Sequence, residues 1–252
     1  MSADTFTLEI LRYVPDRHPR PEPQIFRVPY VEGWSLLDAL GHVQDEIDAS
    51  LAYRWSCRMG VCGSCGMMVD GEPRLACEIF LRDHHPGPLR VEPLAHFPIE
   101  RDLVVCQDDF LAKLTRVRPW LHQEAPPPRG DGRAGEQRQR PAELLAYEAT
   151  SQCINCLLCY SACPQVGLNE GFLGPAAIAL AHRYDQDSRD QGAAHRREAL
   201  QAREGVWTCT LVGHCSTVCP KGVDPAGAIQ KEKLAGALTW ARDLLWPRGG
   251  EP

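Results

Sequence analysis

The chain has 252 residues, of which 44% are hydrophobic, and a formal net charge of −6. These values fit one or two globular domains and give no reason to expect nucleic-acid binding, which depends on a basic surface. The longest apolar stretches, such as Ala176–Ala181, are far shorter than the roughly 18 residues of a membrane-spanning helix. No secretion signal is visible at Met1–Thr5, so we expect a reducing compartment, where disulfide pairing of the twelve cysteines is the weaker explanation.

In the first half of the chain, apolar and polar residues alternate over short stretches, as in β-strands. Residues 7–13 and 24–28 show this alternation. Ser35 precedes a helical pattern whose apolar face runs from Leu36 to Ile47. A short strand at 67–69 enters an Asp70-Gly71 turn, and residues 75–77 are expected as its return. This combination predicts a small β-grasp domain over residues 1–118.

The second half differs in composition. Residues 119–141 are rich in proline and glycine, as in a linker. Beyond them, a helix is expected from Gly174-Pro175 to Tyr184, and another from the cap Asp224 and Pro225, carrying Ile229, Leu234, Leu238 and Leu245. We therefore expect an α+β protein in which residues 142–252 form an all-α domain.

The first block of cysteines, Cys57-x4-Cys62-x2-Cys65, is followed by Cys77 after eleven further residues. This is the plant-type spacing for a [2Fe–2S] cluster. Gly60, Gly63 and Gly66 would allow the unusual φ and ψ angles of a loop whose N–H groups wrap an anionic cluster. A zinc knuckle is the alternative, but a glycine-rich x4 loop is unusual for zinc.

The second block reads Cys153-x2-Cys156-x2-Cys159-x3-Cys163-Pro164, the pattern of two-cluster bacterial ferredoxins. The third nearly repeats it as Cys209-x2-Val212-x2-Cys215-x3-Cys219-Pro220. In such proteins the cysteine before proline ligates the other cluster. The rule assigns a [4Fe–4S] cluster to Cys153, Cys156, Cys159 and Cys219, and leaves Cys163, Cys209 and Cys215 for the other site.

Val212 stands at the missing fourth corner of that other site and cannot ligate iron. A [3Fe–4S] cluster is therefore expected there. A labile [4Fe–4S] cluster with water at the open corner, or zinc at both sites, remains an alternative. Losing one iron should raise the reduction potential and place this cluster late in an electron path.

Two other residues carry weaker signals. Cys106 lies in an apolar run and is expected to be a buried small hydrophobe. His214 either tunes the neighbouring Cys215 site, faces a redox partner, or is an ordinary surface residue. We find no dinucleotide-binding glycine motif, P-loop or nucleophile elbow. The chain is thus expected to carry electrons between partners without a flavin or nicotinamide site of its own.

The two halves and three blocks together resemble the iron–sulfur subunit of the succinate dehydrogenase and fumarate reductase family. The resemblance covers Thr7 to about Lys233. Several stretches are similar to bacterial quinol:fumarate reductases, among them residues 53–69, 97–105 and 174–184. Succinate dehydrogenases typically carry two tryptophans shortly after the first Cys-Pro, where this chain has Gly167-Leu168. That departure favours the fumarate reductase branch and menaquinol.

The resemblance implies a four-subunit membrane complex on the cytoplasmic face of a bacterial inner membrane. A flavoprotein with covalent FAD would dock on the N-terminal domain, and two hydrophobic anchor subunits would meet the C-terminal domain. Electrons would pass from menaquinol through [3Fe–4S], [4Fe–4S] and [2Fe–2S] clusters to the flavin and fumarate. The positions that match the family's quinone site are Thr210, Gln230 and Lys233, although a solvated helix surface is the alternative for the last two. Trp240 and Trp246 would lie at the membrane interface.

Three other readings are kept. The same subunit in a succinate dehydrogenase would run the reaction in the opposite direction. A free-standing ferredoxin-like carrier would be a soluble monomer. A zinc-bound structural protein would give a colourless preparation.

Overall fold

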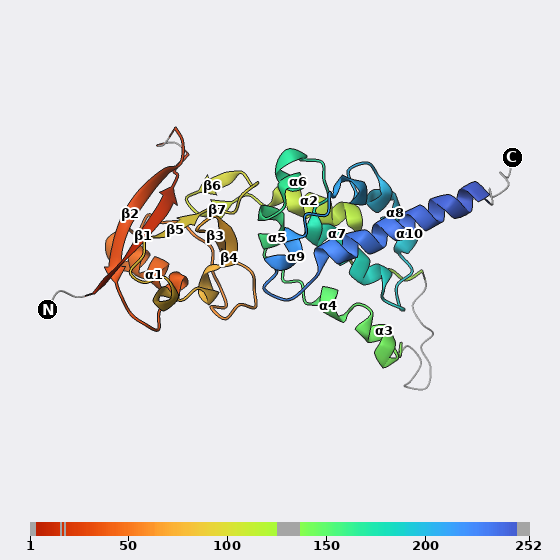
Figure 1. The fold of residues 1–252 in the computed structure, drawn as a ribbon, viewed down its shortest axis with the longest axis horizontal. Helices are drawn as coiled ribbons and strands as arrows, with labels where there is room; N and C mark the ends of the chain where they lie inside the picture. The colour runs from red at the N-terminus through yellow and green to blue at the C-terminus, as the bar shows by residue number, and fades with distance from the viewer. Residues whose placement is uncertain (1–3, 16, 18, 125–136, 246–252) are drawn as a thin grey trace.

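The computed structural model describes residues 4–15, 17, 19–124 and 137–245. A β-sheet domain and a helical domain lie end to end and give the molecule an elongated shape (Figure 1). The α+β class predicted from the sequence is confirmed. Two predictions concern residues outside the described ranges, namely Trp246 and the central part of the proposed 119–141 linker.

The N-terminal domain is built on a five-stranded sheet. Its strands are β1 (Thr5–Arg12), β2 (Glu22–Pro29), β3 (Gly66–Val69), β4 (Glu72–Leu75) and β5 (Leu89–Glu92), in the spatial order β2-β1-β5-β3-β4. The two central strands, β1 and β5, run parallel, and the other neighbours are antiparallel. Alternate residues of β1, namely Phe6, Leu8 and Ile10, are fully buried, and each side chain contributes roughly 1.5–3 kcal/mol of hydrophobic stabilisation.

One helix, α1 (Leu36–His42), packs its Leu36, Leu37 and Leu40 into this core and continues as a π-helical turn, η1 (Val43–Ile47). It begins at Ser35 as predicted, with reciprocal bonds between the Ser35 hydroxyl and the backbone N–H of Asp38 and between the Asp38 carboxylate and the backbone N–H of Ser35.

The prediction that residues 75–77 form the return strand is wrong for Ala76 and Cys77. Strand β4 ends at Leu75, and Cys77 lies in a 3-10 turn, η2 (Ala76–Glu78). The backbone N–H of Ala76 donates to the carbonyl of Cys65, 3.0 Å away, and this bond turns the chain back toward the cysteine loop. The domain is completed by η3 (Leu81–Asp83) and by a small hairpin of β6 (Ile99–Arg101) and β7 (Val104–Val105).

The remaining elements are helical. They are α2 (Asp108–Val117), α3 (Pro141–Leu145), α4 (Glu148–Ser151), α5 (Leu158–Ser161), α6 (Pro164–Leu168), α7 (Pro175–Asp185), α8 (Ala193–Gln201), η4 (Val206–Thr208), α9 (His214–Thr217) and α10 (Pro225–Leu245). Helix α7 is almost entirely buried, with α2, α8 and α10 packed against it. Although α2 lies within the span assigned to the N-terminal domain, it packs against α7 and α8 of the helical domain.

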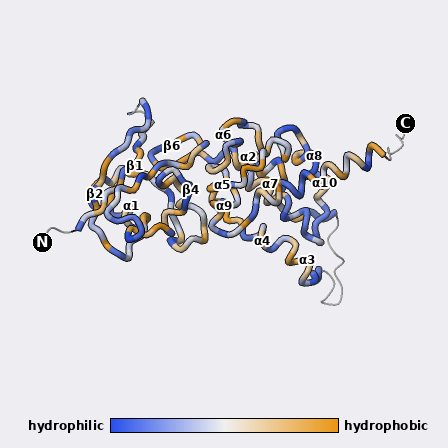
Figure 2. Tube along the Cα trace, viewed as in Figure 1, coloured by the Kyte–Doolittle hydropathy of each residue, from blue (hydrophilic) through white to orange (hydrophobic). Residues whose placement is uncertain are grey.

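Helix α10 begins as predicted, because the Asp224 carboxylate accepts a hydrogen bond from the backbone N–H of Gly227 at 2.9 Å. Ile229 is buried, but Leu234, Leu238 and Leu245 are exposed. The end of α10 extends beyond the rest of the helical domain, and hydrophobic residues continue along it (Figure 2). Among the helices of the described residues, none is long and apolar enough to cross a membrane.

Candidate cluster-binding sites

The four cysteines of the first block come together in one loop region of the β-sheet domain. The sulfurs of Cys65 and Cys77 lie 3.4 Å apart, and the backbone N–H of Gly60 donates to the Cys77 sulfur at 3.3 Å. The Cys57 sulfur accepts from the N–H groups of Val61 and Cys62, both at 3.3 Å. This arrangement of thiols and inward N–H groups fits an anionic iron–sulfur cluster.

The glycines of this loop have two different roles. Gly60 and Gly63 adopt positive φ values of 67° and 74°, as expected for a tight loop. Gly66 has no positive φ, and glycine is needed there because the backbone of another loop lies close to it. A Cβ on Gly66 would lie 2.9 Å from the carbonyl oxygen of Cys156, and a Cβ on Gly63 would lie 2.9 Å from the Cys156 Cα. The first cysteine loop therefore contacts the second directly, a relationship that the sequence analysis missed.

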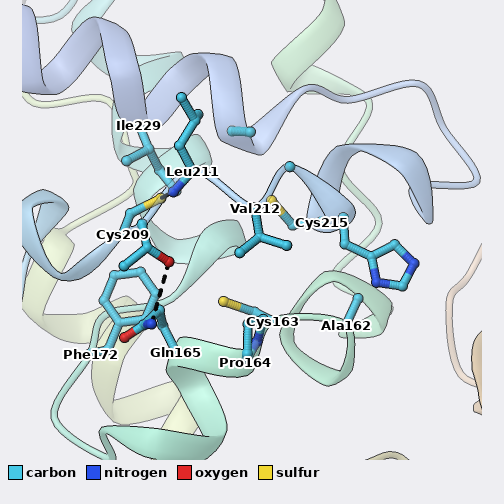
Figure 3. A pocket seen from close by; sticks show the side chains of 14 residues that line it. Ala162, Cys163, Pro164, Gln165, Phe172, Cys209, Leu211, Val212, Cys215 and Ile229 are labelled. Atoms are coloured by element: carbon cyan, nitrogen blue, oxygen red, sulfur yellow. Dashed lines mark hydrogen bonds between the residues drawn. The ribbon is translucent and has the colours of Figure 1, made fainter.

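In the helical domain, the cysteines line two cavities. Cys153, Cys156, Cys159 and Cys219 line one of them. The other is lined by Cys163, Cys209 and Cys215 together with Val212. Figure 3 shows these three sulfurs and the Val212 side chain turned toward the same space. Each cavity thus receives its last cysteine from the opposite block, the arrangement that the spacing rule assigns.

The backbone repeats between the two blocks. Asn155 and Leu157 take left-handed conformations with φ of 53° and 65°, and Leu211 and Gly213, at the equivalent positions, have φ of 59° and 82°. Short helices follow each pair, α5 from Leu158 and α9 from His214. Non-glycine residues in this conformation cost of order 1–3 kcal/mol each. The loop around Val212 is therefore shaped like the loop around Cys156, with valine in place of the thiol.

Burial alters the acidity of these thiols. It raises the pKa of Cys65 to about 12 and the pKa of Cys156 and of Cys215 to about 11. Cys62 differs, because the backbone N–H of Cys57 and the Ser64 hydroxyl donate to its sulfur and lower its pKa to about 6. The buried thiols thus become thiolates only when a metal replaces their protons.

The donor atoms of these sites are cysteine sulfurs spread around two pockets. In the part of the chain that the structure describes, no three His, Cys, Asp or Glu side chains converge as they would around a single metal ion. The cysteines instead line the two pockets from several sides. An all-sulfur donor set of this kind fits iron–sulfur clusters.

The three residues predicted to contact quinone have separate environments. The Thr210 hydroxyl, at the rim of the cavity beside Val212, accepts a hydrogen bond from the Gln165 amide at 3.4 Å (dashed line in Figure 3). The Lys233 ammonium donates to the backbone carbonyl of Cys209 at 2.6 Å. The amide nitrogen of Gln230 is buried and has no hydrogen-bond partner among the described residues. Gln165 was not found from sequence, because a glutamine two residues after a cysteine carries no specific signal.

Two further contacts link the domains near this cavity. The His214 ring lies 3.2 Å from the carboxylate of Glu72 in the β4 strand. The His96 ring packs against Gly167, and a Cβ on Gly167 would lie 2.5 Å from that ring. Cys106, expected to be buried, is half-buried, and its backbone N–H donates to the Pro98 carbonyl.

Comparison with protein families finds two matches along the chain. Residues 7–112 match the 2Fe-2S iron-sulfur cluster binding domain, and residues 148–223 match the 4Fe-4S dicluster domain. The first match contains Cys57, Cys62, Cys65 and Cys77. The second contains the cysteines of both helical-domain cavities.

Individual relatives cover nearly the whole chain. A fumarate reductase iron-sulfur subunit of Mycobacterium tuberculosis is 56% identical over 247 residues, covering 98% of this chain and 99% of its own. One of Escherichia coli O157:H7 is 50% identical, with coverages of 96% and 97%. A succinate dehydrogenase iron-sulfur subunit of Paracoccus denitrificans is 37% identical, with coverages of 89% and 85%.

The fold has a solved counterpart. A chain of the Mycobacterium smegmatis Sdh1 complex in the apo form superposes with a TM-score of 0.82 at 25% identity, covering 94% of this chain and 98% of that one. Both the domain order and the relative placement of the two domains therefore have a precedent.

Proposed function

Because this chain belongs to the family of succinate dehydrogenase and fumarate reductase iron–sulfur subunits, and is thus an electron-transfer subunit of an oxidoreductase complex, we propose that it serves quinol:fumarate reduction. In this role it would pass electrons from menaquinol to the FAD of a flavoprotein partner. When bound, its clusters would supply one-electron carriers between these two-electron reactants.

The observation that carries the proposal is the arrangement of the cysteines. The first cysteine loop contacts the loop of Cys156 through Gly63 and Gly66, and cysteines of the second and third blocks together line both cavities of the helical domain. We assign [2Fe–2S] to Cys57, Cys62, Cys65 and Cys77, [4Fe–4S] to Cys153, Cys156, Cys159 and Cys219, and [3Fe–4S] to Cys163, Cys209 and Cys215. These assignments produce one continuous row of carriers.

Two observations support fumarate reduction over succinate oxidation. The fumarate reductase relatives described above are 50% and 56% identical to this chain, whereas the succinate dehydrogenase relative is 37% identical. In addition, the His96 ring occupies the space beside Gly167 that a tryptophan at this position would need. A tryptophan at position 167, as in succinate dehydrogenases, would therefore have to displace the His96 ring.

Exposed apolar side chains at the cavity that contains Val212 support docking on a membrane-anchored partner. Leu211 and Val212 line that cavity and are exposed, and Leu168, Trp207 and Trp240 are exposed elsewhere on the helical domain. An exposed apolar surface of this kind typically marks an interface. We propose that two hydrophobic anchor subunits cover it on the cytoplasmic side of the membrane, and that Thr210, Gln230 and Lys233 lie near menaquinone at that interface.

Low-temperature EPR on the anaerobically purified and then air-oxidised complex tests the cluster assignment. Oxidised [2Fe–2S] and [4Fe–4S] clusters are diamagnetic, so a near-isotropic signal of about one spin per chain is expected from [3Fe–4S] alone. A silent spectrum from a brown, iron-loaded sample would contradict the assignment. Comparing menaquinol-driven fumarate reduction with succinate-driven quinone reduction in the same preparation tests the direction, because the proposal requires the first to be faster.

A further inference from the structure

Lys233 holds a positive charge against the backbone of a predicted cluster ligand. Its ammonium donates to the carbonyl oxygen of Cys209 at 2.6 Å, across 24 residues of sequence. The side chain is half-buried where α10 passes the Cys209 loop. The position of the charge is therefore fixed by a hydrogen bond, whereas an exposed lysine would sample many positions.

Among the residues that the structure describes, no carboxylate forms an ion pair with this charge. The nearest acidic residue in sequence, Glu232, is buried on another side of α10, where its carboxylate lies 2.6 Å from Nδ1 of His182. Within the described ranges, Lys233 forms no ion pair with any Asp or Glu. A half-buried ammonium without a carboxylate partner is costly unless another negative group lies nearby.

We propose that this negative group is the cluster bound by Cys163, Cys209 and Cys215, and that Lys233 raises its reduction potential. The inference rests on the proposed function, which places a cluster at these cysteines. Reducing the cluster adds one electron, supplied by the quinol, and so increases its negative charge by one. A fixed positive charge on the carbonyl of a ligand residue favours that reduced state.

This role is separate from quinone binding. An ammonium group has three N–H donors, and the bond to Cys209 uses one of them. The other two remain available to a quinone carbonyl. The charge of Lys233 therefore acts on the cluster whether or not a quinone is present.

The test is an EPR-monitored redox titration of the [3Fe–4S] signal in the purified complex. Four variants are compared with the wild type: Lys233→Met removes the charge, Lys233→Gln keeps a hydrogen-bond donor without charge, Lys233→Arg keeps the charge, and Lys231→Met removes an exposed charge two residues away. The midpoint potential should become more negative in the Met and Gln variants at position 233. It should stay near the wild-type value in Lys233→Arg and Lys231→Met.

The outcomes separate this inference from the proposed function. Wild-type midpoints in both Lys233→Met and Lys233→Gln, with quinol oxidation lost, would overturn the inference and leave Lys233 with a role at the quinone only. Equal shifts in Lys233→Met and Lys231→Met would also overturn it, because the effect would then follow net charge and not the contact with Cys209. If wild-type protein gives no [3Fe–4S] signal, the proposed function itself fails. Integrated signal intensity in each variant shows whether the cluster is assembled.

Discussion

The carbonyl oxygen of Cys156 lies 2.9 Å from the position that a Cβ on Gly66 would occupy. This contact joins the β-sheet domain to the helical domain at the point where their cysteine loops meet. Only glycine permits such an approach without displacing one loop. The spacing between the first two cysteine sets therefore depends on a residue that ligates nothing.

We expect Gly66→Ala to destabilise the protein. Because the new methyl group would contact Cys156 and Leu158 too closely, the cost should be about 1–3 kcal/mol, as for other overpacked sites. The measurement is the denaturant midpoint at which the visible absorption of the clusters is lost. Gly33→Ala is the matched control, since nothing lies within 4 Å of its added Cβ. Equal midpoints for the two variants would show that the contact tolerates a methyl group.

Replacing Val212 with cysteine should change the cluster type. Val212 lines the cavity with Cys163, Cys209 and Cys215, and its loop has the same backbone form as that of Cys156. The variant should therefore bind a fourth iron, and the air-oxidised EPR signal should fall from about one spin per chain to near zero. Val212→Ala supplies no ligand and should retain the signal. An undiminished signal in Val212→Cys would mean that the new thiol does not reach the iron.

Asp185 should make the stability depend on pH near neutrality. Burial raises its pKa to about 6 from an ordinary value of 3.8, an effect that the hydrogen bond from Arg196 only partly offsets. A raised carboxyl pKa in the folded state means that the stabilisation is complete below pH 3.8 and is lost as the pH rises through 6. The free energy of unfolding should thus decrease by about 3 kcal/mol at most over the whole titration, of which about 1.4 kcal/mol falls between pH 5 and 7.5.

Denaturant midpoints over this pH range check the expectation. Asp185→Asn should flatten the dependence. Asp187 provides the contrast, because hydrogen bonds from Arg189 lower its pKa to about 2 and it stays ionised throughout. Asp187→Asn should reduce stability by a similar amount at every pH in the range. If the stability of Asp185→Asn still depends on pH to the same extent, another titrating group causes the dependence.

The buried pair of His182 and Glu232 should contribute to the packing of α7 against α10. Glu232→Ala removes the only described hydrogen-bond partner of the His182 side chain, and leaving a buried polar group unsatisfied costs about 1–3 kcal/mol. Thermal loss of cluster absorbance should occur at a lower temperature than in the wild type. Glu198→Ala, on the exposed face of α8, should have little effect. A similar loss in both variants would argue against a specific role of the pair.

Sequence reasoning predicted the local features well. The cap at Ser35, the hairpin turn at Asp70-Gly71 and the start of α10 at Asp224 depend on residues close together in the chain, and the structure has all three. The grouping of the cysteines could also be predicted from the sequence, because in two-cluster ferredoxins the cysteine before proline ligates the other cluster. The structure places the cysteines accordingly around two cavities.

What the sequence did not reveal depends on how distant segments pack. The role of Gly66 arises only when the two domains meet, and the bond from Lys233 to Cys209 only when α10 passes the third cysteine loop. The leucines of α10 illustrate the same limit. Their spacing indicates an apolar helix face, but no periodicity shows that Leu234 and Leu238 are exposed and lie uncovered by the described parts of the chain.

The exchange of cysteines between the two blocks also constrains biosynthesis. One helical-domain cavity takes Cys219 from the third block, and the other takes Cys163 from the second. During translation, neither cavity has its full set of thiols until most of the third block has left the ribosome. With the cluster assignment proposed above, iron would enter this domain only after both blocks have been synthesised, and the first cluster inserted would hold the two blocks together for the second.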